Sequence, residues 1–338
     1  MRNLTISSLF LLVLGGLVAY LAFLLPGASA GSYDPASINS GDTAWTLVSI
    51  ALVMLMTPAI GFFYGGMVSA KNVVSVLKQS MFILALVSIQ WVLIGYSLAF
   101  GPDAHGIIGT LQYFGLHGVG FAPNADYAAT IPHLAFMMFQ MMFAVVTSAI
   151  IIGAFVGRIR FMTLVVFTLV WTTLVYDPIA HWVWSPLGWL HALGALDFAG
   201  GTVVHMSAGF SALAAALLVG KRLDGAHPAS TANSVPFVIL GAALLWFGWF
   251  GFNAGSALSA GALAASAFVV TNIAAAAAAV TWVLLSMAEH KKPSALAGAI
   301  GAVCGLVAIT PASGYVGPLS ALAIGLIGGV ATYLAVYW

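Results

Sequence analysis

The chain has 338 residues, of which 62% are hydrophobic and only 5% are charged, and its formal net charge is +1. Soluble domains carry about 25% charged residues, so this composition indicates a single membrane domain and argues against a soluble module. The near-neutral charge offers no basic surface for nucleic acid. The only cysteine, Cys304, permits no internal disulfide and is expected to be a small core residue.

The first 30 residues form a segment of their own. Arg2 precedes an apolar run from Ile6 to Leu25, and Ala28-Ser29-Ala30 offers a cleavage site. Residues 1–30 are therefore predicted to be a secretory signal peptide, although the apolar run exceeds the usual length of about 7–15 residues. An uncleaved helix is the alternative. Both interpretations place residue 31 and the start of the remaining chain outside.

The basic residues that follow Arg2 are confined to four clusters. The clusters are Lys71 with Lys78, Arg158 with Arg160, Lys221 with Arg222, and Lys291 with Lys292. Each is followed by two long apolar segments, and the connection between those segments has no basic residue. Basic loops resist translocation, so the connections that carry the clusters are predicted to lie in the cytoplasm.

Nine apolar segments after residue 31 are near the length of about 20 residues that crosses a bilayer. They are expected at 43–68, 73–100, 131–157, 161–184, 198–220, 236–255, 266–288, 295–311 and 317–337. The later spans are rich in glycine and alanine, as in Ala274–Ala279. Small residues let membrane helices approach closely, so a tightly packed helical bundle is predicted.

The fifth span begins with a polar signature, Asp197-Phe-Ala-Gly-Gly-Thr-Val-Val-His205. Asp197 sits where a helix N-cap belongs, and its carboxylate could accept the free amides of Ala199 or Gly200. A structural cap is its simplest role. His205 follows eight residues later, about 12 Å further along a helix. A histidine at that depth is costly unless it faces a cavity or a partner, and a hydrogen-bonded packing histidine is the alternative.

Aromatic residues gather in three of the spans. Phe139 and Phe143 lie one turn apart around Gln140, Trp246, Trp249 and Phe252 share a face at spacings of three, and Trp184 ends the fourth span. Aromatic residues at membrane ends usually form an interfacial belt, which is the alternative for Trp184. Ring faces also attract cations. With His205, this pattern predicts a narrow apolar conduit that has a cation site at its mouth.

Seven motifs follow one another along the chain. They are GFFYGGMVSAKNV (Gly61–Val73), FMMFQ (Phe136–Gln140), GRIRF (Gly157–Phe161), YDPIAHWVW (Tyr176–Trp184), ALDFAGGTVVH (Ala195–His205), GWFGFNAGSAL (Gly248–Leu258) and KPSALAGAIGAVCGLVAITPASGYVGP (Lys292–Pro318). In this order they resemble the ammonium transporter family, the Amt/Rh/methylammonium-permease group. The resemblance extends from residue 43 to the C-terminus. The tryptophan of HWVW favours the ammonium-transporter branch over the Rhesus branch.

The resemblance implies a recruitment site and a gate. Family members bind ammonium in an outer vestibule between a phenylalanine, a tryptophan and a serine, which match Phe143, Trp184 and Ser256. Two stacked phenylalanines, which match Phe143 and Phe252, then close the pore. The ammonium ion, or methylammonium, would lose a proton there, and the neutral amine would pass. No cofactor or metal is implied.

The resemblance also implies a channel below this gate. The channel of the family is lined by two histidines, the first of which matches His205, and the imidazoles could relay a proton separately. Gln140 and Trp249 match residues near the gate and the pore. Asp197 matches an acid that supports the vestibule and the end of its helix.

The family fold is an all-α polytopic bundle of eleven spans, built from two inverted five-helix repeats and a final helix. The sequence ends at Trp338 after four spans of the second repeat. Residues 31–338 are therefore expected to form the membrane domain without the last two helices, the second pore histidine and the cytoplasmic tail. The pore wall beside His205 would then be open, and this 338-residue form is expected to conduct poorly.

The resemblance further implies a homotrimer in the cell membrane, and a PII-type regulator that engages the tail of full-length members. A non-transporting ammonium sensor is one alternative, but the sequence shows no additional signalling domain. An intramembrane enzyme is another, but Asp197 and His205 lie too far apart on one helix to form a catalytic pair, and the sequence has no cluster of metal ligands. The protein is therefore not expected to be an enzyme.

Overall fold

The structure is a computed structural model that describes residues 16, 33–220 and 232–337. Almost all of the expected signal peptide, residues 1–30, lies outside the described residues, as does the basic pair Lys221 and Arg222. Within the described part, nine helical segments are long and apolar enough to cross a membrane, which confirms the number of spans predicted from the sequence.

The spans run in chain order, and several contain a π-helical turn, labelled η. They are α2 (Ser40–Met67); α3 (Val73–Gln90) with η3 (Trp91–Gly95) and α4 (Tyr96–Phe100); α5 (His133–Phe155); α6 (Phe161–Trp171) with η5 (Thr172–Tyr176) and α7 (Asp177–Trp184); η6 (Gly201–Met206) with α9 (Ser207–Val219); α10 (Val235–Trp249) with η7 (Phe250–Ala254); α11 (Ala262–His290); α12 (Ala295–Ile309) with the 3₁₀ turn η8 (Thr310–Ala312); and α13 (Pro318–Tyr337). The predicted limits are close, and the largest shift at a helix start is in α11, which begins at Ala262 instead of 266.

The connections contain short elements that the all-α prediction did not include. They are the 3₁₀ helices η1 (Pro35–Ser37), η2 (Ala70–Asn72) and η4 (Leu111–Leu116), the strands β1 (Asp103–Ala104) and β2 (Ile108–Gly109), and the short helix α8 (Trp189–Ala192). The strands β1 and β2 pair antiparallel to form a small hairpin, with Asp103 opposite Gly109. A hairpin of this size does not change the helical class of the fold.

Hydrogen bonds between connections show which helix ends share a side of the bundle. At one end of the bundle, the guanidinium of Arg158, just after α5, donates to the carbonyl of Gly220 at 2.6 Å. The amide of Ser234 donates to the carbonyl of Gly66 at 3.0 Å. At the opposite end, the amide of Asn39 donates to the carbonyl of Thr130 at 2.8 Å. The described lysines and arginines belong to the first end, which we call the inner end, and the second is called the outer end.

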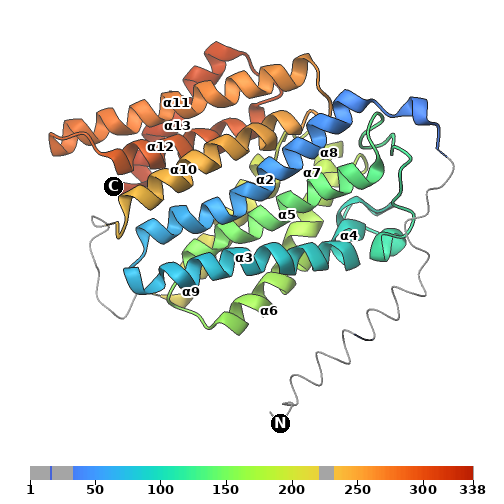
Figure 1. The fold of residues 1–338 in the computed structure, drawn as a ribbon, viewed down its shortest axis with the longest axis horizontal. Coiled ribbons are helices and arrows are strands. Elements are labelled where there is room, and N and C mark those ends of the chain that lie inside the picture. The colour runs from blue at the N-terminus through green and yellow to red at the C-terminus, as the bar shows by residue number, and fades with distance from the viewer. Residues whose placement is uncertain (1–15, 17–32, 221–231, 338) are drawn as a thin grey trace, which may run out of the picture.

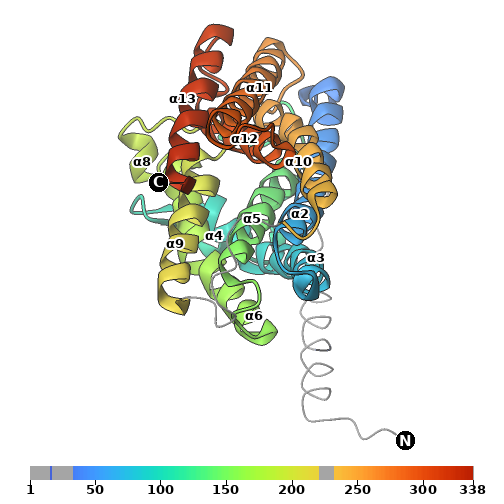
Figure 2. The same ribbon diagram turned by 90° about the vertical axis from the view of Figure 1, so that its left-hand side faces the viewer.

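Small residues bring the helices into close contact. Figure 1 shows α10 alongside α2, and Figure 2 shows α10 to α13 gathered on one side of the bundle. A Cβ on Gly241 of α10 would lie 2.4 Å from the backbone nitrogen of Phe63 in α2. A Cβ on Gly305 of α12 would lie 2.4 Å from the carbonyl oxygen of Ala274 in α11. The tight packing predicted from the glycine and alanine content is therefore present.

The helix α5 lies at the centre, and it contacts α2, α3 and α9. In contrast, α9 and the last residue of η6 keep large apolar side chains on their surface: Met206 of η6 is 52% exposed, and Phe210, Leu213 and Leu217 of α9 are 65%, 55% and 75% exposed. These side chains form an apolar face on α9 that the described part of a single chain leaves uncovered. Such a face is suited to lipid or to another protein surface.

Candidate functional site

A cavity of about 150 Å³ opens near the outer end of the bundle, and we call it the outer vestibule. Its wall includes Gln140 and Phe143 from α5, Trp184 from the end of α7, and Ser256, which follows η7. Three separate helical spans therefore bring together the three residues that the sequence matched to a recruitment site. The structure also places Gln140 in this cavity, on the outer side of the phenylalanine pair.

Hydrogen bonds fix the orientation of the indole of Trp184. Its Nε1–H donates to the carbonyl oxygen of Asp197 at 3.1 Å, so the polar edge of the ring is occupied by the protein. The ring meets Phe143 edge to face, with centroids 5.8 Å apart and planes at 86°. Because the N–H is used, what Trp184 offers to a ligand in the vestibule is its π surface, which attracts cations.

Two acceptor oxygens on helical spans contribute to the polar part of the vestibule. The hydroxyl of Ser256 donates to the carbonyl of Phe252 at 2.8 Å, which leaves its oxygen lone pairs free to accept. The Oε1 atom of Gln140 is buried and has no hydrogen-bond partner among the described residues. A ligand with several N–H donors and a positive charge therefore suits this cavity.

The rings of Phe143 and Phe252, whose planes are tilted by 34°, close the vestibule on its inner side. The two ring centroids are 4.4 Å apart, and both side chains are buried. Phe139 braces Phe143 from within α5, with centroids 4.8 Å apart. Phe143 lines the outer vestibule and Phe252 lines the next cavity, so the pair forms a partition between the two.

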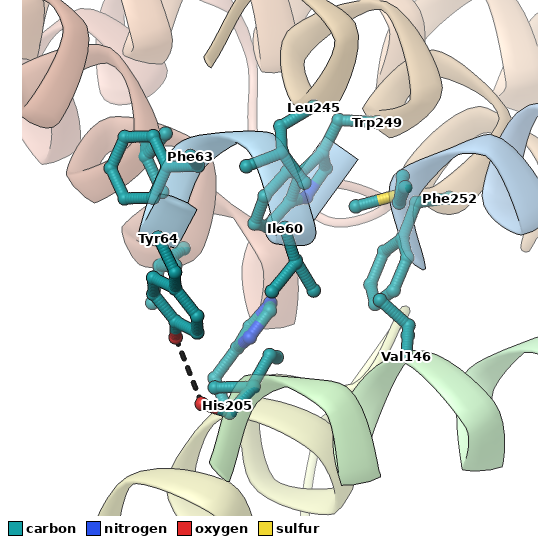
Figure 3. A pocket seen from close by; sticks show the side chains of 12 residues that line it. Ile60, Phe63, Tyr64, Val146, His205, Leu245, Trp249 and Phe252 are labelled. Carbon is teal, nitrogen blue, oxygen red and sulfur yellow. Dashed lines mark hydrogen bonds between the residues drawn. The ribbon is translucent and has the colours of Figure 1, made fainter. Parts of the chain in front are cut away.

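Below the pair lies an apolar cavity of about 210 Å³, which we call the inner cavity. Figure 3 shows part of its wall, to which α2, α5, η6, α10 with η7, and α12 contribute. Its polar groups are few. The hydroxyl of Tyr64 donates to the carbonyl of Ile150 at 2.8 Å, the contact drawn in the figure, and is therefore already satisfied. His205 is the other titratable residue in the wall.

His205 is held by stacked aromatic rings. Its imidazole lies 5.3 Å from the ring of Trp249 at 27°, and 5.7 Å from that of Phe252 at 20°. The indole of Trp249 is itself fixed, because its Nε1–H donates to Thr310 Oγ1 at 2.9 Å. The Nε2 atom of His205 is buried and has no hydrogen-bond partner among the described residues. The sequence left open that His205 is a packing residue held by hydrogen bonds. At Nε2 the described residues supply no such bond.

The helix that carries His205 begins later than the sequence suggested. The π-helical turn η6 starts at Gly201, and Gly200 has the left-handed backbone angle φ 109°, which favours glycine. The amide of His205 bonds to the carbonyl of Gly200 at 3.0 Å, five residues back. The predicted helix start at 198 is therefore wrong, because the residues just before Gly201 are not helical; the predicted depth of about 12 Å had assumed a straight helix.

The carboxylate of Asp197 caps this helix. It accepts four backbone amides, those of Gly200, Gly201 and Thr202 at 2.7 Å and that of Val203 at 3.1 Å. Of the two amides predicted as partners, Gly200 is bonded and Ala199 is not. Since both carboxylate oxygens are engaged, Asp197 supports the vestibule indirectly, through its carbonyl bond to Trp184.

One aromatic residue does not join the site. Trp246 was predicted to share a face with Trp249 and Phe252, but it lines neither of the two cavities. In an α-helix, a spacing of three residues rotates a side chain by about 60° relative to the first. Three positions at this spacing therefore cannot all face a narrow channel.

Other vestibule and cavity residues were missed by the sequence reasoning. Tyr64 stands in a motif that was noted for its resemblance alone, although a tyrosine within a membrane span is a signal in its own right. Asp126 and Tyr127 line the outer vestibule from the long connection before α5. Nothing in the local sequence indicates that this loop folds back over the site.

Two other histidines, His181 in α7 and His133 at the start of α5, are bonded to groups of the protein. His181 bonds to the carbonyl of Ala99 through Nδ1 and to Asp103 through Nε2, both at 3.0 Å. His133 contacts the hydroxyl of Tyr96 at 2.5 Å. Neither lines either cavity. Among residues 33–220 and 232–337, no group of three His, Cys, Asp or Glu side chains is arranged to hold a metal ion.

A membrane bundle with an outer polar mouth, a ring partition and an apolar cavity beyond it defines a protein of the transport class. The sequence matches the profile of the Ammonium Transporter Family over residues 44–338. The chain belongs to this family.

Individual relatives agree. An ammonium transporter of Bacillus subtilis is 52% identical over 300 residues, a match that covers 89% of this chain and 73% of that protein. The ammonium transporter Amt1 of Archaeoglobus fulgidus is 48% identical over 298 residues, covering 88% and 73% of the two chains. The crystal structure of Saccharomyces cerevisiae Mep2 superposes with a TM-score of 0.85 at 38% identity, covering 92% of this chain and 73% of Mep2.

Proposed function

We propose that the protein recruits NH4+ in the outer vestibule, removes a proton there, and conducts NH3 through the inner cavity. The observation that carries this proposal is the partition formed by Phe143 and Phe252 between a cavity with cation-binding groups and a cavity with almost none. Ammonium is the substrate, as the names of the relatives give it for those proteins, and methylammonium is added from the family resemblance.

The outer vestibule replaces part of the water around the ion. The ring faces of Trp184 and Phe143 attract the charge, and the Ser256 oxygen accepts an N–H because its own hydrogen is donated to Phe252. Gln140 supplies a further acceptor. These groups suit a tetrahedral donor such as NH4+. K+ has no hydrogen to donate and cannot use the hydrogen-bonding geometry.

The inner cavity determines the form that passes. An isolated charge in a medium of low dielectric constant costs tens of kcal/mol, so a bare cation is excluded from a cavity lined mainly by apolar side chains. NH4+ avoids this cost by leaving its proton on the outer side, as NH4+ → NH3 + H+. K+ cannot be neutralised in this way. The imidazole of His205, with its unpartnered Nε2, then offers the small neutral molecule a hydrogen bond.

Uptake of labelled methylammonium by cells that express the protein from its own gene tests this function. Saturable uptake that unlabelled ammonium inhibits and excess K+ does not is the expected result. If these cells take up no more methylammonium than cells without the gene, the proposed function is contradicted.

Sensing is the second candidate, because the chain also superposes on a solved sensor Amt protein with a TM-score of 0.80 at 34% identity, covering 87% of this chain and 74% of that one. A sensor would bind ammonium at the same vestibule without passing it on. Ammonium binding to the purified protein together with no uptake in cells would favour the sensor over the transporter.

The topology supports an orientation in a cell membrane with the outer end facing away from the cytoplasm, since the described basic residues lie at the inner end. The apolar face of α9, which includes Phe210 and Leu217, is available for contact between subunits. A homotrimer is the assembly we propose from the family resemblance, with a PII-type regulator on the cytoplasmic side. The mass of the detergent-purified protein by light scattering tests the trimer.

A further inference from the structure

Among the aspartates described at the outer end, one has a carboxylate that makes no hydrogen bond or ion pair with the described residues. The others accept hydrogen bonds: Asp34 from the amide of Ala36, Asp42 from Thr130 and the amide of Ala260, Asp103 from the amide of Gly106 and in its pair with His181, and Asp197 from four amides. The carboxylate of Asp126 accepts no hydrogen bond and forms no ion pair within the described residues, and its side chain is exposed. Asp126 nevertheless lines the outer vestibule together with Trp184 and Ser256.

The loop around Asp126 is anchored to the vestibule wall. The amide of Asp126 donates to Asn124 Oδ1 at 3.1 Å, and the amide of Ala128 donates to the carbonyl of Asn124 at 2.7 Å. The next residue, Tyr127, stacks on Phe136 of α5 with centroids 5.1 Å apart and planes at 13°. The turn thus holds the backbone of Asp126 at the mouth of the vestibule and leaves the carboxylate facing water.

The negative charge of Asp126 contributes to the pKa shifts of two nearby tyrosines. Burial raises the pKa of Tyr127 to about 12, and the charges of Asp126 and Asp103 contribute to the same shift. Burial also raises the pKa of Tyr113, and Asp126 is again a contributor. A potential that disfavours a phenolate at this place favours a cation there.

We propose that Asp126 is an additional recruitment residue, which concentrates hydrated monovalent cations at the mouth of the outer vestibule before Trp184, Phe143 and Ser256 select ammonium. This inference rests on the proposed function. Clefts of one charge sign raise the local concentration and the arrival rate of ions of the opposite sign. A carboxylate that still has its water attracts K+ as well as NH4+, so Asp126 contributes to capture at low concentration and not to selectivity.

The test compares Asp126→Asn with the wild type in methylammonium uptake at low ionic strength and at about 0.15 M salt, where the Debye length is about 8 Å. At low ionic strength the half-saturating concentration should rise about 3- to 10-fold, the order expected for one unit charge a few ångströms from a hydrated cation. The maximal rate should stay within about twofold of the wild type. The difference between the two proteins should shrink at the higher salt concentration, and Asp126→Glu should restore the wild-type value.

Asp34→Asn is the matched control, because it removes the same charge from the same end of the protein at a residue outside the vestibule. It should leave the half-saturating concentration unchanged. If Asp126→Asn and the wild type show the same uptake at both salt concentrations, this inference is overturned and the proposed function stays intact. A fall in maximal rate that Asp126→Glu does not restore would also overturn it, in favour of a role in folding the loop. Absence of uptake by the wild type would instead remove the proposed function.

Discussion

The imidazole of His205 lies almost parallel to the ring of Phe252, with 20° between the planes and 5.7 Å between the centroids. Phe252 therefore contacts Phe143 on the vestibule side and His205 on the side of the inner cavity. The ring of Phe252 is therefore all that separates Phe143 from the first polar side chain beyond the partition. A molecule that passes the two phenylalanines meets an imidazole at once.

Replacing His205 with alanine should abolish selective conduction while leaving the protein folded. The imidazole lines the inner cavity, and its Nε2 makes no hydrogen bond within the described residues that the fold would lose. Uptake in cells and the elution profile of the detergent-purified protein measure the two effects. His191→Ala is a control outside both cavities. If His205→Ala aggregates and His191→Ala does not, His205 is a packing residue after all.

His205→Glu keeps a titratable group in the same place. We expect this variant to retain flux and to admit K+, because a carboxylate can stabilise a cation in the inner cavity and a neutral imidazole cannot. Currents measured in ammonium and in K+ solutions separate the two ions. A variant that conducts ammonium and still excludes K+ would show that the partition alone determines selectivity.

Trp184→Leu should weaken recruitment more than it lowers the maximal rate. A ring face contributes about 0.5–2 kcal/mol to cation binding, which corresponds to a rise of about 2- to 30-fold in the half-saturating concentration. Trp189→Leu removes a tryptophan that does not line the vestibule and should change little. An unchanged concentration dependence in Trp184→Leu would contradict the assignment of this residue to the recruitment site.

The packing of α12 on α11 depends on Gly305. A Cβ there would lie 2.4 Å from the carbonyl oxygen of Ala274, so Gly305→Ala should destabilise the protein by about 1–3 kcal/mol. Gly209 in α9 has nothing within 4 Å of such a Cβ, and Gly209→Ala should be neutral or stabilise the helix by about 0.5–1 kcal/mol. Thermal midpoints in detergent give the signs of both changes, and equal midpoints would show that the helices can separate without cost.

The hairpin of β1 and β2 should loosen in acid. The hydrogen bond from His181 lowers the pKa of Asp103, with help from the amide of Gly106. A carboxyl whose pKa is lower in the folded state stabilises that state fully above its unfolded pKa of about 3.9, and loses this contribution as the pH falls through the folded value. Hydrogen exchange of residues 103–109 should therefore be protected at pH 5 and lose protection below about pH 4. In Asp103→Asn this pH dependence should disappear, and its persistence would exclude Asp103 as the cause.

The sequence predicted the membrane spans well because hydropathy and basic clusters are local signals. The partition was also accessible, since Phe139 and Phe143 are one turn apart and a resemblance supplied Phe252 as the partner. The π-helical turns were not predictable in this way. A turn such as η6 depends on a tertiary contact, because Gly201 lies so near Pro311 that a Cβ would approach it to 2.4 Å.

The contribution of the long connection before α5 was not predictable either. Asp126 reaches the vestibule because Tyr127 stacks on Phe136 and donates to the carbonyl of Phe100 at 3.1 Å. These contacts join residues that have no shared periodicity in the sequence. Spacing could identify the residues on helices that face the pore, but it could not identify the loop that covers the entrance.

The most direct test of the central claim is the ion selectivity of the protein, expressed from its own gene and reconstituted in liposomes. If NH4+ is recruited at Trp184 and Ser256 and deprotonated before the Phe143–Phe252 pair, ammonium flux should saturate with concentration, and K+ should not be carried at any concentration. His205→Ala should lose the ammonium flux without gaining a K+ flux. Transport of K+ by the wild-type protein at a rate comparable to that of ammonium would contradict this account, because K+ has no proton to leave behind.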